Sequence, residues 1–347
     1  MPTKNIQHFH ISTGTMIRFL GILAMLAALF MIRDILLSLV FAVIIASAVE
    51  PAILWLKERN IPRILGVILL YLGGAVSFFF LVYLVVPLFF EELRTFSVAY
   101  PRIEEEIRSG IARVGEVPFS SFLTVNVEEL LGIPSQYLGQ LGSGVAGAAS
   151  AAFGGLFSFI LVIVFSFYLA AQEDGIENFL RLVTPVRHES YILDLWARSR
   201  RKLGRWLRTQ LLLGAIVGVL IFFGLTILGV EHALFFAALS AIFEIIPVVG
   251  PILAAVPGVT AAFLVSPYMG LLATSLYIVV QQIESHVIVP VVMRRTVDLS
   301  PLIVVLALLV GGKLGGIFGI LLAVPITAIG AELLNDWDKK KRALMPE

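Results

Sequence analysis

Two stretches of this chain share one unusual design: LFFAALSAIFEIIPVVGPILAAVPGVTAAFLV (Leu234–Val265) and LIVVLALLVGGKLGGIFGILLAVPITAI (Leu302–Ile329). Each consists of two apolar runs separated by a break, PVVGP at 247–251 and GGKLGG at 311–316. A bilayer-spanning helix needs about 20 apolar residues, so one run is short for a crossing and a whole stretch is long. Helix breaks survive at membrane depth only where protein or a water-filled cavity satisfies the freed backbone groups, and in transporters they mark the binding site. The two stretches therefore favour a transport function.

The composition predicts an all-α polytopic membrane protein. Hydrophobic residues make up 59% of the 347 positions and charged residues only 14%, against roughly 25% charged in a soluble domain. The chain has no cysteine, which excludes disulfides, cysteine zinc ligands and thiol catalysis. It also lacks HExxH, GxSxG and P-loop motifs and any histidine cluster, so we expect no enzyme, no catalytic residue, no metal and no cofactor.

Eight apolar blocks can be marked along the chain. They cover 15–32, 35–56, 63–90, 145–170, 209–229, 233–265, 269–289 and 301–333. We expect about six full transmembrane helices, with 233–265 and 301–333 as two broken re-entrant helical hairpins whose tips meet near the midplane. The first block lacks a small-residue cleavage site and is followed at once by another block, so we interpret it as a retained helix and not a signal peptide.

The distribution of Lys and Arg predicts the orientation, since these residues collect on the cytoplasmic side. Segment 171–208 carries eight Lys/Arg against five Asp/Glu, and the tail 334–347 contains the run KKKR, so both should lie inside. Segment 91–144 carries eight Glu and four Arg and should lie outside. The N- and C-termini are therefore both expected in the cytoplasm.

These expectations divide the chain into six parts. They are 1–90, an N-terminal tail with three transmembrane helices; 91–144, an external amphipathic helical segment; 145–170, a transmembrane helix; 171–208, a cytoplasmic and interfacial amphipathic region; 209–333, a transport core; and 334–347, a cytoplasmic tail. Within 191–208, tryptophans and aliphatic residues alternate with basic residues at helical intervals. Such a helix is expected in the headgroup plane, with membrane lipid and no nucleic acid as its partner.

The C-terminal half allows two arrangements. If both broken blocks span, Arg294 and Arg295 fall outside, against the positive-inside rule; if both are hairpins, these arginines fall inside. The second arms share AVPGVTA (Ala255–Ala261) and AVPITA (Ala323–Ala328), which would suit an inverted repeat. The alternative is that such residues are simply common in membrane helices.

Several polar residues lie within the apolar blocks, where a charge costs roughly 2.5–3.5 kcal/mol on insertion scales and needs a partner or a use. Glu244 precedes the first break and is either a proton or cation site or a capping carboxylate. Block 269–289 places polar residues at helical spacing on one face, with Glu284 as a pathway carboxylate. Lys313 in the second break either counters a negative charge or extends to water. The candidate pathway residues are Glu244, Pro247, Gly250, Tyr277, Gln281, Glu284 and Lys313.

Small residues recur every four positions at Gly144, Ala148 and Ala152. This pattern lets two helix backbones approach closely, either within the chain or between subunits. The pattern alone does not distinguish these two cases.

Three motifs show a family resemblance over nearly the whole chain: FEIIPVVGP (Phe243–Pro251), QQIESHVIVPVVMRR (Gln281–Arg295) and LSPLIVVLALLVGGKLGGIFGILLAVP (Leu299–Pro325). In these the chain resembles the autoinducer-2 exporter family of bacterial membrane proteins. The resemblance implies an oligomeric inner-membrane transporter, since members are linked to export of a signalling molecule and in some cases to sodium/proton exchange. It does not fix the substrate.

Two classes of function remain open. The first is a secondary transporter or exporter of a small polar solute or signalling molecule, ion- or proton-coupled, with a monovalent cation/proton antiporter as its variant. The second is a non-transporting oligomeric membrane scaffold, in which the broken blocks build only an interface. Convergence of Glu244, Gln281, Glu284 and Lys313 on one cavity would favour transport.

Overall fold

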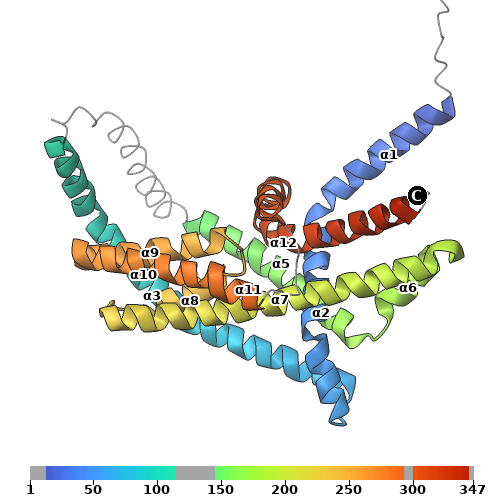
Figure 1. The fold of residues 1–347 in the computed structure, drawn as a ribbon, viewed down its shortest axis with the longest axis horizontal. Coiled ribbons are helices and arrows are strands. Elements are labelled where there is room, and N and C mark those ends of the chain that lie inside the picture. The colour runs from blue at the N-terminus through green and yellow to red at the C-terminus, as the bar shows by residue number, and fades with distance from the viewer. Residues whose placement is uncertain (1–12, 115–144, 293–299, 344–347) are drawn as a thin grey trace, which may run out of the picture.

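The computed structural model describes residues 13–114, 145–292 and 300–343, and these residues form helices without any strand (Figure 1). The helices are α1 (Thr13–Met31), α2 (Arg33–Glu58), α3 (Arg63–Val114), α5 (Val145–Ala171), α6 (Gly175–Val183), α7 (Val186–Leu228), α8 (Ala233–Phe243), α9 (Val249–Val265), α10 (Pro267–Ile283), the π-helix η1 (Glu284–Ile288), α11 (Val289–Val292) and α12 (Pro301–Ala343). The expected all-α class is thus confirmed.

Five helical segments in the described part of the chain are long and apolar enough to cross a membrane. They are Arg33–Glu58, Arg63–Glu92, Val186–Leu228, Pro267–Val292 and Phe318–Arg342. A sixth exists if Ser158–Ala171 and Gly175–Val183, which meet at 85°, count as one span. Helix α1 covers the first apolar block but is one of the shorter apolar helices, as are α8 and α9. The structure therefore agrees with a multi-pass membrane protein of about five to six spans.

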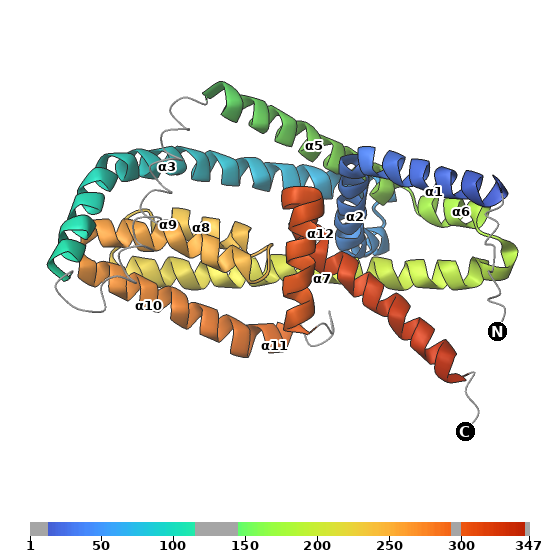
Figure 2. The same ribbon diagram turned by 90° about the horizontal axis from the view of Figure 1, so that it is seen from above.

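The first broken block forms two helices, α8 and α9, that fold back on each other. The two helices contact each other and line one groove together. Only residues 244–248 connect them, so helices that pack side by side across so short a turn run antiparallel. Both ribbon views show α8 and α9 side by side with α10 and the second half of α7 (Figures 1 and 2). The block is therefore a helical hairpin in its geometry.

The turn of this hairpin is set by Pro247 and the residues after it. Proline has no N–H to continue α8, and the Val249 N–H donates to the Pro247 carbonyl at 2.8 Å. The intervening Val248 has φ +70° and ψ −51°, a tight three-residue turn that is strained for a β-branched residue. Gly250 follows, and a Cβ there would lie 1.8 Å from the Phe243 carbonyl oxygen. Only glycine lets the two backbones meet this closely.

The second broken block is interrupted at Gly315 and Gly316, within the expected GGKLGG segment. Gly316 has φ +55° and ψ −136°, a conformation open almost only to glycine. Cβ atoms at Gly311 and Gly319 would each lie within about 2.3 Å of the other residue's carbonyl oxygen, so the two parts of α12 pack backbone to backbone. Its main contacts are with α2 and α7. The tips of the two broken blocks were expected to meet, but each packs in a different part of the molecule.

Helix α7 joins the two parts of the protein. Its second half packs in a core with α8, α9 and α10, around Phe235 and Phe236. Its first half packs in another core, with Trp206 buried against α2 and α12. Glycines allow both contacts, since a Cβ at Gly204 would lie 2.2 Å from the Ser47 carbonyl oxygen and one at Gly214 would lie 2.5 Å from the Ala241 carbonyl oxygen.

Segment 191–208 differs from the expected separate interfacial helix. It is continuous with 209–228 in α7, and Leu203, Trp206 and Leu207 are buried inside the protein. These side chains pack against apolar residues of α2 and α12. Likewise, the helical part of segment 91–144 continues α3 as far as Val114, and the rest of that segment lies outside the described residues.

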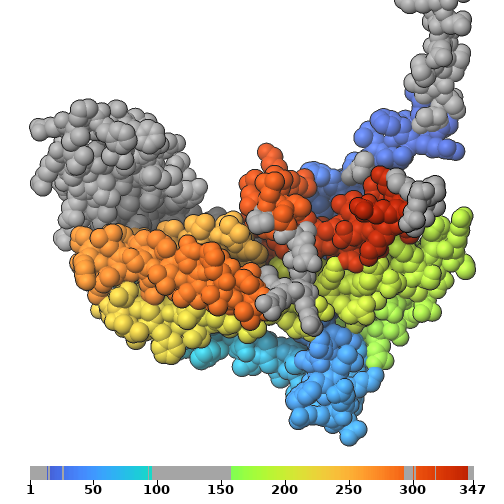
Figure 3. Space-filling view, viewed as in Figure 1, coloured from blue at the N-terminus to red at the C-terminus, as the bar shows by residue number. Residues whose placement is uncertain are grey.

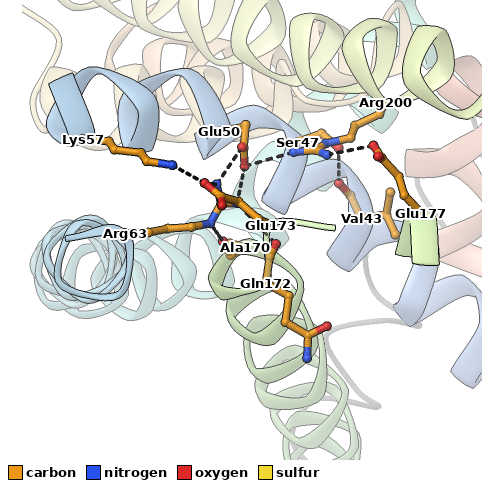
Figure 4. A network of polar contacts seen from close by, with 10 residues as sticks. All are labelled: Val43, Ser47, Glu50, Lys57, Arg63, Ala170, Gln172, Glu173, Glu177 and Arg200. Atoms are coloured by element: carbon orange, nitrogen blue, oxygen red, sulfur yellow. Dashed lines mark hydrogen bonds and ion pairs between the residues drawn. The ribbon is translucent and has the colours of Figure 1, made fainter. Parts of the chain in front are cut away.

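Three basic residues of segment 171–208, Arg198, Arg200 and Lys202, pair with carboxylates from other elements. Figure 4 shows Arg200 beside Glu50 of α2, which the Arg63 guanidinium binds through two hydrogen bonds of 3.0 and 2.9 Å. Nearby, the hydrogen bond from Lys57 lowers the pKa of the exposed Glu173 carboxyl. The network ties together the C-terminal parts of α2 and α5, the start of α3 and the first half of α7.

A second network joins α7 to the last part of α12. Arg198 pairs with Asp336 at 2.6 Å and with Glu332 at 2.5 Å, and Lys202 also binds Glu332. The C-terminal part of the described chain is thus held beside segment 171–208, with which it was expected to share one side of the membrane.

We expect Gly250→Ala to destabilise the protein, because the new methyl group would overlap the Phe243 carbonyl and open the α8–α9 turn. Overpacking of this kind costs about 1–3 kcal/mol or more. The melting temperature of the purified protein in detergent should fall clearly. Gly73→Ala is the matched control, since a Cβ at Gly73 meets nothing within 4 Å. Equal melting temperatures for the two variants would contradict the close approach at Gly250.

Candidate functional site

Three buried polar side chains converge where the α8–α9 turn meets α7 and α10. Glu244 ends α8 and is 1% exposed, Glu284 opens the π-helix at the end of α10 and is 7% exposed, and Gln210 of α7 is 1% exposed. Buried polar groups are costly unless they are hydrogen-bonded. Their concentration at a helix break makes this the candidate site of the molecule.

The carboxyl groups of Glu244 and Glu284 are near enough to each other for an electrostatic interaction. Glu284 also accepts a hydrogen bond of 3.1 Å from the Gln281 amide, one helical turn earlier. The Glu244 Oε2 atom has no hydrogen-bond partner in the described part of the chain. Two ionised carboxylates offer only acceptors, so this pair needs either a proton or a bound cation between its oxygens.

Gln210 binds the backbone freed by the helix break. Its side-chain amide donates to the carbonyl of Glu244, which α8 leaves without a helical partner at its end. Its own Oε1 is buried without a partner among the described residues. Gln210 therefore fixes the tip of α8 against α7 and leaves one further acceptor atom at the site.

A cavity of about 350 Å³ opens beside Glu284, between α9, α10 and the second half of α7. Its polar lining consists of Ser240, Tyr277, Gln281 and Glu284, and its other nine lining residues are apolar. The Tyr277 hydroxyl has no hydrogen-bond partner in the described chain and lies over Gly258, where a Cβ would be 2.4 Å from it. The cavity thus has one polar end and otherwise apolar walls.

The end of α10 turns into a π-helix at the carboxylate. Single π-turns are uncommon and occur frequently at functional sites. Tyr277, Gln281 and Glu284 precede or open this segment and face the cavity, whereas His286 within it is exposed and binds the Gln282 carbonyl at 3.1 Å. The predicted polar stripe therefore continues to Glu284 and no further.

The structure brings together most of the candidate pathway residues. Glu244, Tyr277, Gln281 and Glu284 meet at the site, and Pro247 and Gly250 form the turn next to it. Lys313 does not join them, because it is exposed on α12, whose main contacts are α2 and α7. In the space-filling view the surface of α10 lies to the left and the red surface of α12 to the right (Figure 3).

Gln210 is a residue of the candidate site that the sequence reasoning missed. The signal for it was present, since Gln210, Gly214 and Gly218 follow one another at intervals of four on a single helix face. Small residues at that spacing mark a close helix contact, and a polar residue in line with them is directed toward the same partner. In the structure both glycines face Ala241 of α8.

Two predictions fall outside the described residues. Arg294 and Arg295, on which the choice of topology depended, lie in the segment 293–299. Gly144 also lies outside the described chain, and the side chains of Ala148 and Ala152 are not described. The small-residue contact and the homo-oligomer therefore stay predictions.

Comparison with known proteins places most of the chain in one family. A family model described as "AI-2E family transporter" matches residues 19–339. The relatives include the Bacillus subtilis protein named "Putative transport protein YueF", 27% identical over 79% of this chain and 76% of its own length. A second protein of the same species, "Putative transport protein YrrI", is 24% identical over 86% of this chain and 85% of its own length. "Putative transport protein YhhT" of Escherichia coli K12 is 23% identical over 90% of this chain and 88% of its own length.

Removal of the Gln210 amide should loosen the α8 tip. We expect Gln210→Ala to lower stability by about 2 kcal/mol, because the Glu244 carbonyl loses its buried hydrogen-bond donor. The exposed Gln282, in the same region, supplies the matched control Gln282→Ala, which should leave the melting temperature of the detergent-solubilised protein unchanged. A Gln210 variant as stable as the Gln282 variant would show that the hydrogen bond contributes nothing.

Proposed function

Because this chain belongs to the AI-2E family of transporters, we propose that it is a secondary transporter or exporter that moves a small polar solute or signalling molecule across the bacterial inner membrane. The family and the apolar helices make it a multi-pass membrane transport protein and not an enzyme. The inner membrane, the cytoplasmic position of both termini, and membrane lipid as a partner are part of the proposal.

The observation that carries the proposal is the buried carboxyl pair of Glu244 and Glu284 at a helix break. Ionisable residues inside membrane segments are expensive and usually mark ion or substrate pathways. Broken helices in transporters place irregular backbone beside the bound solute. Here both features coincide next to a cavity of about 350 Å³, which supports this cavity as the transport site.

The carboxyl pair also supports proton coupling. Two carboxyl groups in contact cannot both ionise freely, because like charges disfavour each other at short range. Exchange of a shared proton for another ion or a solute would link the two movements. A monovalent cation/proton antiporter is the variant of this mechanism in which the exchanged partner is a metal cation.

We further propose that both broken blocks are re-entrant hairpins. The antiparallel packing of α8 against α9 supports this for the first block, and the backbone contact of Gly311 with Gly319 supports it for the second. Neither arm of the first hairpin exceeds 17 residues, which is at the lower limit for a span. In a re-entrant hairpin, both ends of the block lie on the same side of the membrane.

The non-transporting scaffold is the alternative from another class, with the broken blocks serving only as an interface of a homo-oligomer. A scaffold has no need for a carboxyl pair beside a cavity, and a buried charge that serves packing is often replaceable by an apolar residue at no loss of stability. The two functions therefore predict different behaviour of variants at Glu284.

We expect Glu284→Gln to abolish transport or its pH dependence while the protein still inserts and folds. The change keeps the shape of the side chain but removes the exchangeable proton. The measurements are autoinducer-2 efflux and sodium-driven proton movement in proteoliposomes, from acid to alkaline pH. Glu231→Gln, an exposed glutamate in the turn before α8, is the matched control. Parental activity and pH profile in the Glu284 variant would favour the scaffold.

The hairpin proposal is tested by thiol accessibility, since the chain has no native cysteine. Cysteines at positions 231 and 268 flank the first hairpin and should react with an impermeant reagent from the same side of the membrane. If the two positions react from opposite sides, α8 and α9 together cross the bilayer and the hairpin proposal is wrong.

A further inference from the structure

We infer that the cavity beside Glu284 takes a small organic cation, a protonated amine with a short apolar body. This inference rests on the proposed function, since it assigns a substrate class to the same cavity. It depends on the charge at the polar end, the nature of the walls, and the size of the space.

The polar end of the cavity is rich in carboxyl groups and other hydrogen-bond acceptors. Glu284 lines it and Glu244 lies directly behind Glu284. Gln281 directs its amide donor to Glu284 at 3.1 Å, so its oxygen stays free as an acceptor, and the Tyr277 hydroxyl has no partner in the described chain. A primary ammonium carries three donors and no acceptor, which matches this set.

No basic side chain in the described chain lines this cavity. His286, the basic residue nearest to Glu284 in the sequence, is exposed, and its ring forms a hydrogen bond with the Gln282 carbonyl. On α7, the uncharged Val217 and Ile221 line the cavity, and the neutral Gln210 binds the Glu244 carbonyl. An anionic solute would therefore meet two carboxyl groups and no counter-charge, which argues against carboxylates and phosphates.

The apolar walls argue against a polyol. Nine of the thirteen lining residues are apolar, among them Ile221, Ala255 and Val259. A sugar or another polyhydroxyl compound would bury several hydroxyl groups against these walls, and each one without a partner carries a desolvation cost. An alkyl chain instead gains from the same burial.

The size of the cavity argues against a bare metal ion. Its volume of about 350 Å³ lies in the range of small-molecule sites, which begins at about 300 Å³. A bare metal ion would occupy little of this volume, and nine of the thirteen lining residues offer it no side-chain ligand. The space and its walls fit an organic body attached to the charged group.

Cation binding would displace the proton shared by Glu244 and Glu284. When the ammonium enters, it donates N–H hydrogen bonds to the carboxylate oxygens, the shared O–H bond breaks, and the proton leaves to water. One positive charge enters for each proton released, so the charge at the site is conserved. Binding should accordingly weaken as the pH falls, because protons compete for the same oxygens.

The test measures binding of n-pentylammonium to the purified full chain by calorimetry, with 1-pentanol, pentanoate, glycerol and sodium chloride as comparison probes. Pentylammonium should bind, more tightly at higher pH, and the four comparison probes should not compete with it. Glu284→Gln should weaken binding roughly tenfold or more. Glu231→Gln should bind as the parent does, which corrects for partitioning of the amine into detergent.

A second variant keeps the test independent of the carboxyl pair. Ala255→Leu adds volume to the cavity wall, so it should weaken pentylammonium binding strongly and methylammonium binding little. If pentanoate, glycerol or sodium binds at this site and pentylammonium does not, the inferred class is wrong. If Glu284→Gln abolishes transport under that outcome, the proposed function still stands.

Discussion

The hydrogen bond from the Gln210 amide to the Glu244 carbonyl is the contact on which the candidate site depends. An apolar helix that stops at membrane depth leaves its last carbonyls without partners, and lipid cannot supply them. Pro247 forces such a stop after Phe243. Gln210 supplies a donor because Gly214 and Gly218 bring α7 close to α8. The break between α8 and α9 can then lie beside a cavity while the Glu244 carbonyl keeps a hydrogen-bond partner.

The 43-residue helix α7 contacts the first hairpin with one half and the two charged networks with the other. Its second half carries Gln210, Gly214 and Gly218 to the first hairpin, and its first half is fixed by Arg198 and Arg200 to α12 and α2. A single rigid helix thus connects the site with both charged networks. The two broken blocks have no extensive contact with each other, and each packs against a different part of α7.

Much of the fold and part of the site could be predicted from the sequence. Proline and glycine at 247–251 act locally, so their pattern locates the first break correctly, and the helical spacing of Tyr277, Gln281 and Glu284 is enough to place them on one face. Lys313 was expected beside them because both breaks look alike in sequence. Its position depends instead on packing of α12 against α2 and α7, which no local pattern records.

The burial of Trp206 is a second case in which packing between distant segments could not be predicted from a local sequence pattern. Tryptophans among basic residues are typical of a helix in the headgroup plane, and that pattern predicted an exposed apolar face. The pattern is identical when the apolar face meets protein and the basic residues meet carboxylates, as Arg198 does with Asp336. Only the partner distinguishes the two cases, and Asp336 is 138 residues away in the chain.

The π-helix at Glu284 gives the site its boundary. In an uninterrupted α-helix the face of Tyr277 and Gln281 would continue beyond Glu284 to Ile288. The wider turn from Glu284 to Ile288 changes that register, and within it Glu284 is buried while His286 is exposed. His286 is two residues after Glu284, so it points to nearly the opposite side of the helix. The polar face of α10 that meets the cavity therefore ends at Glu284, and no basic side chain of the described part of this helix joins it.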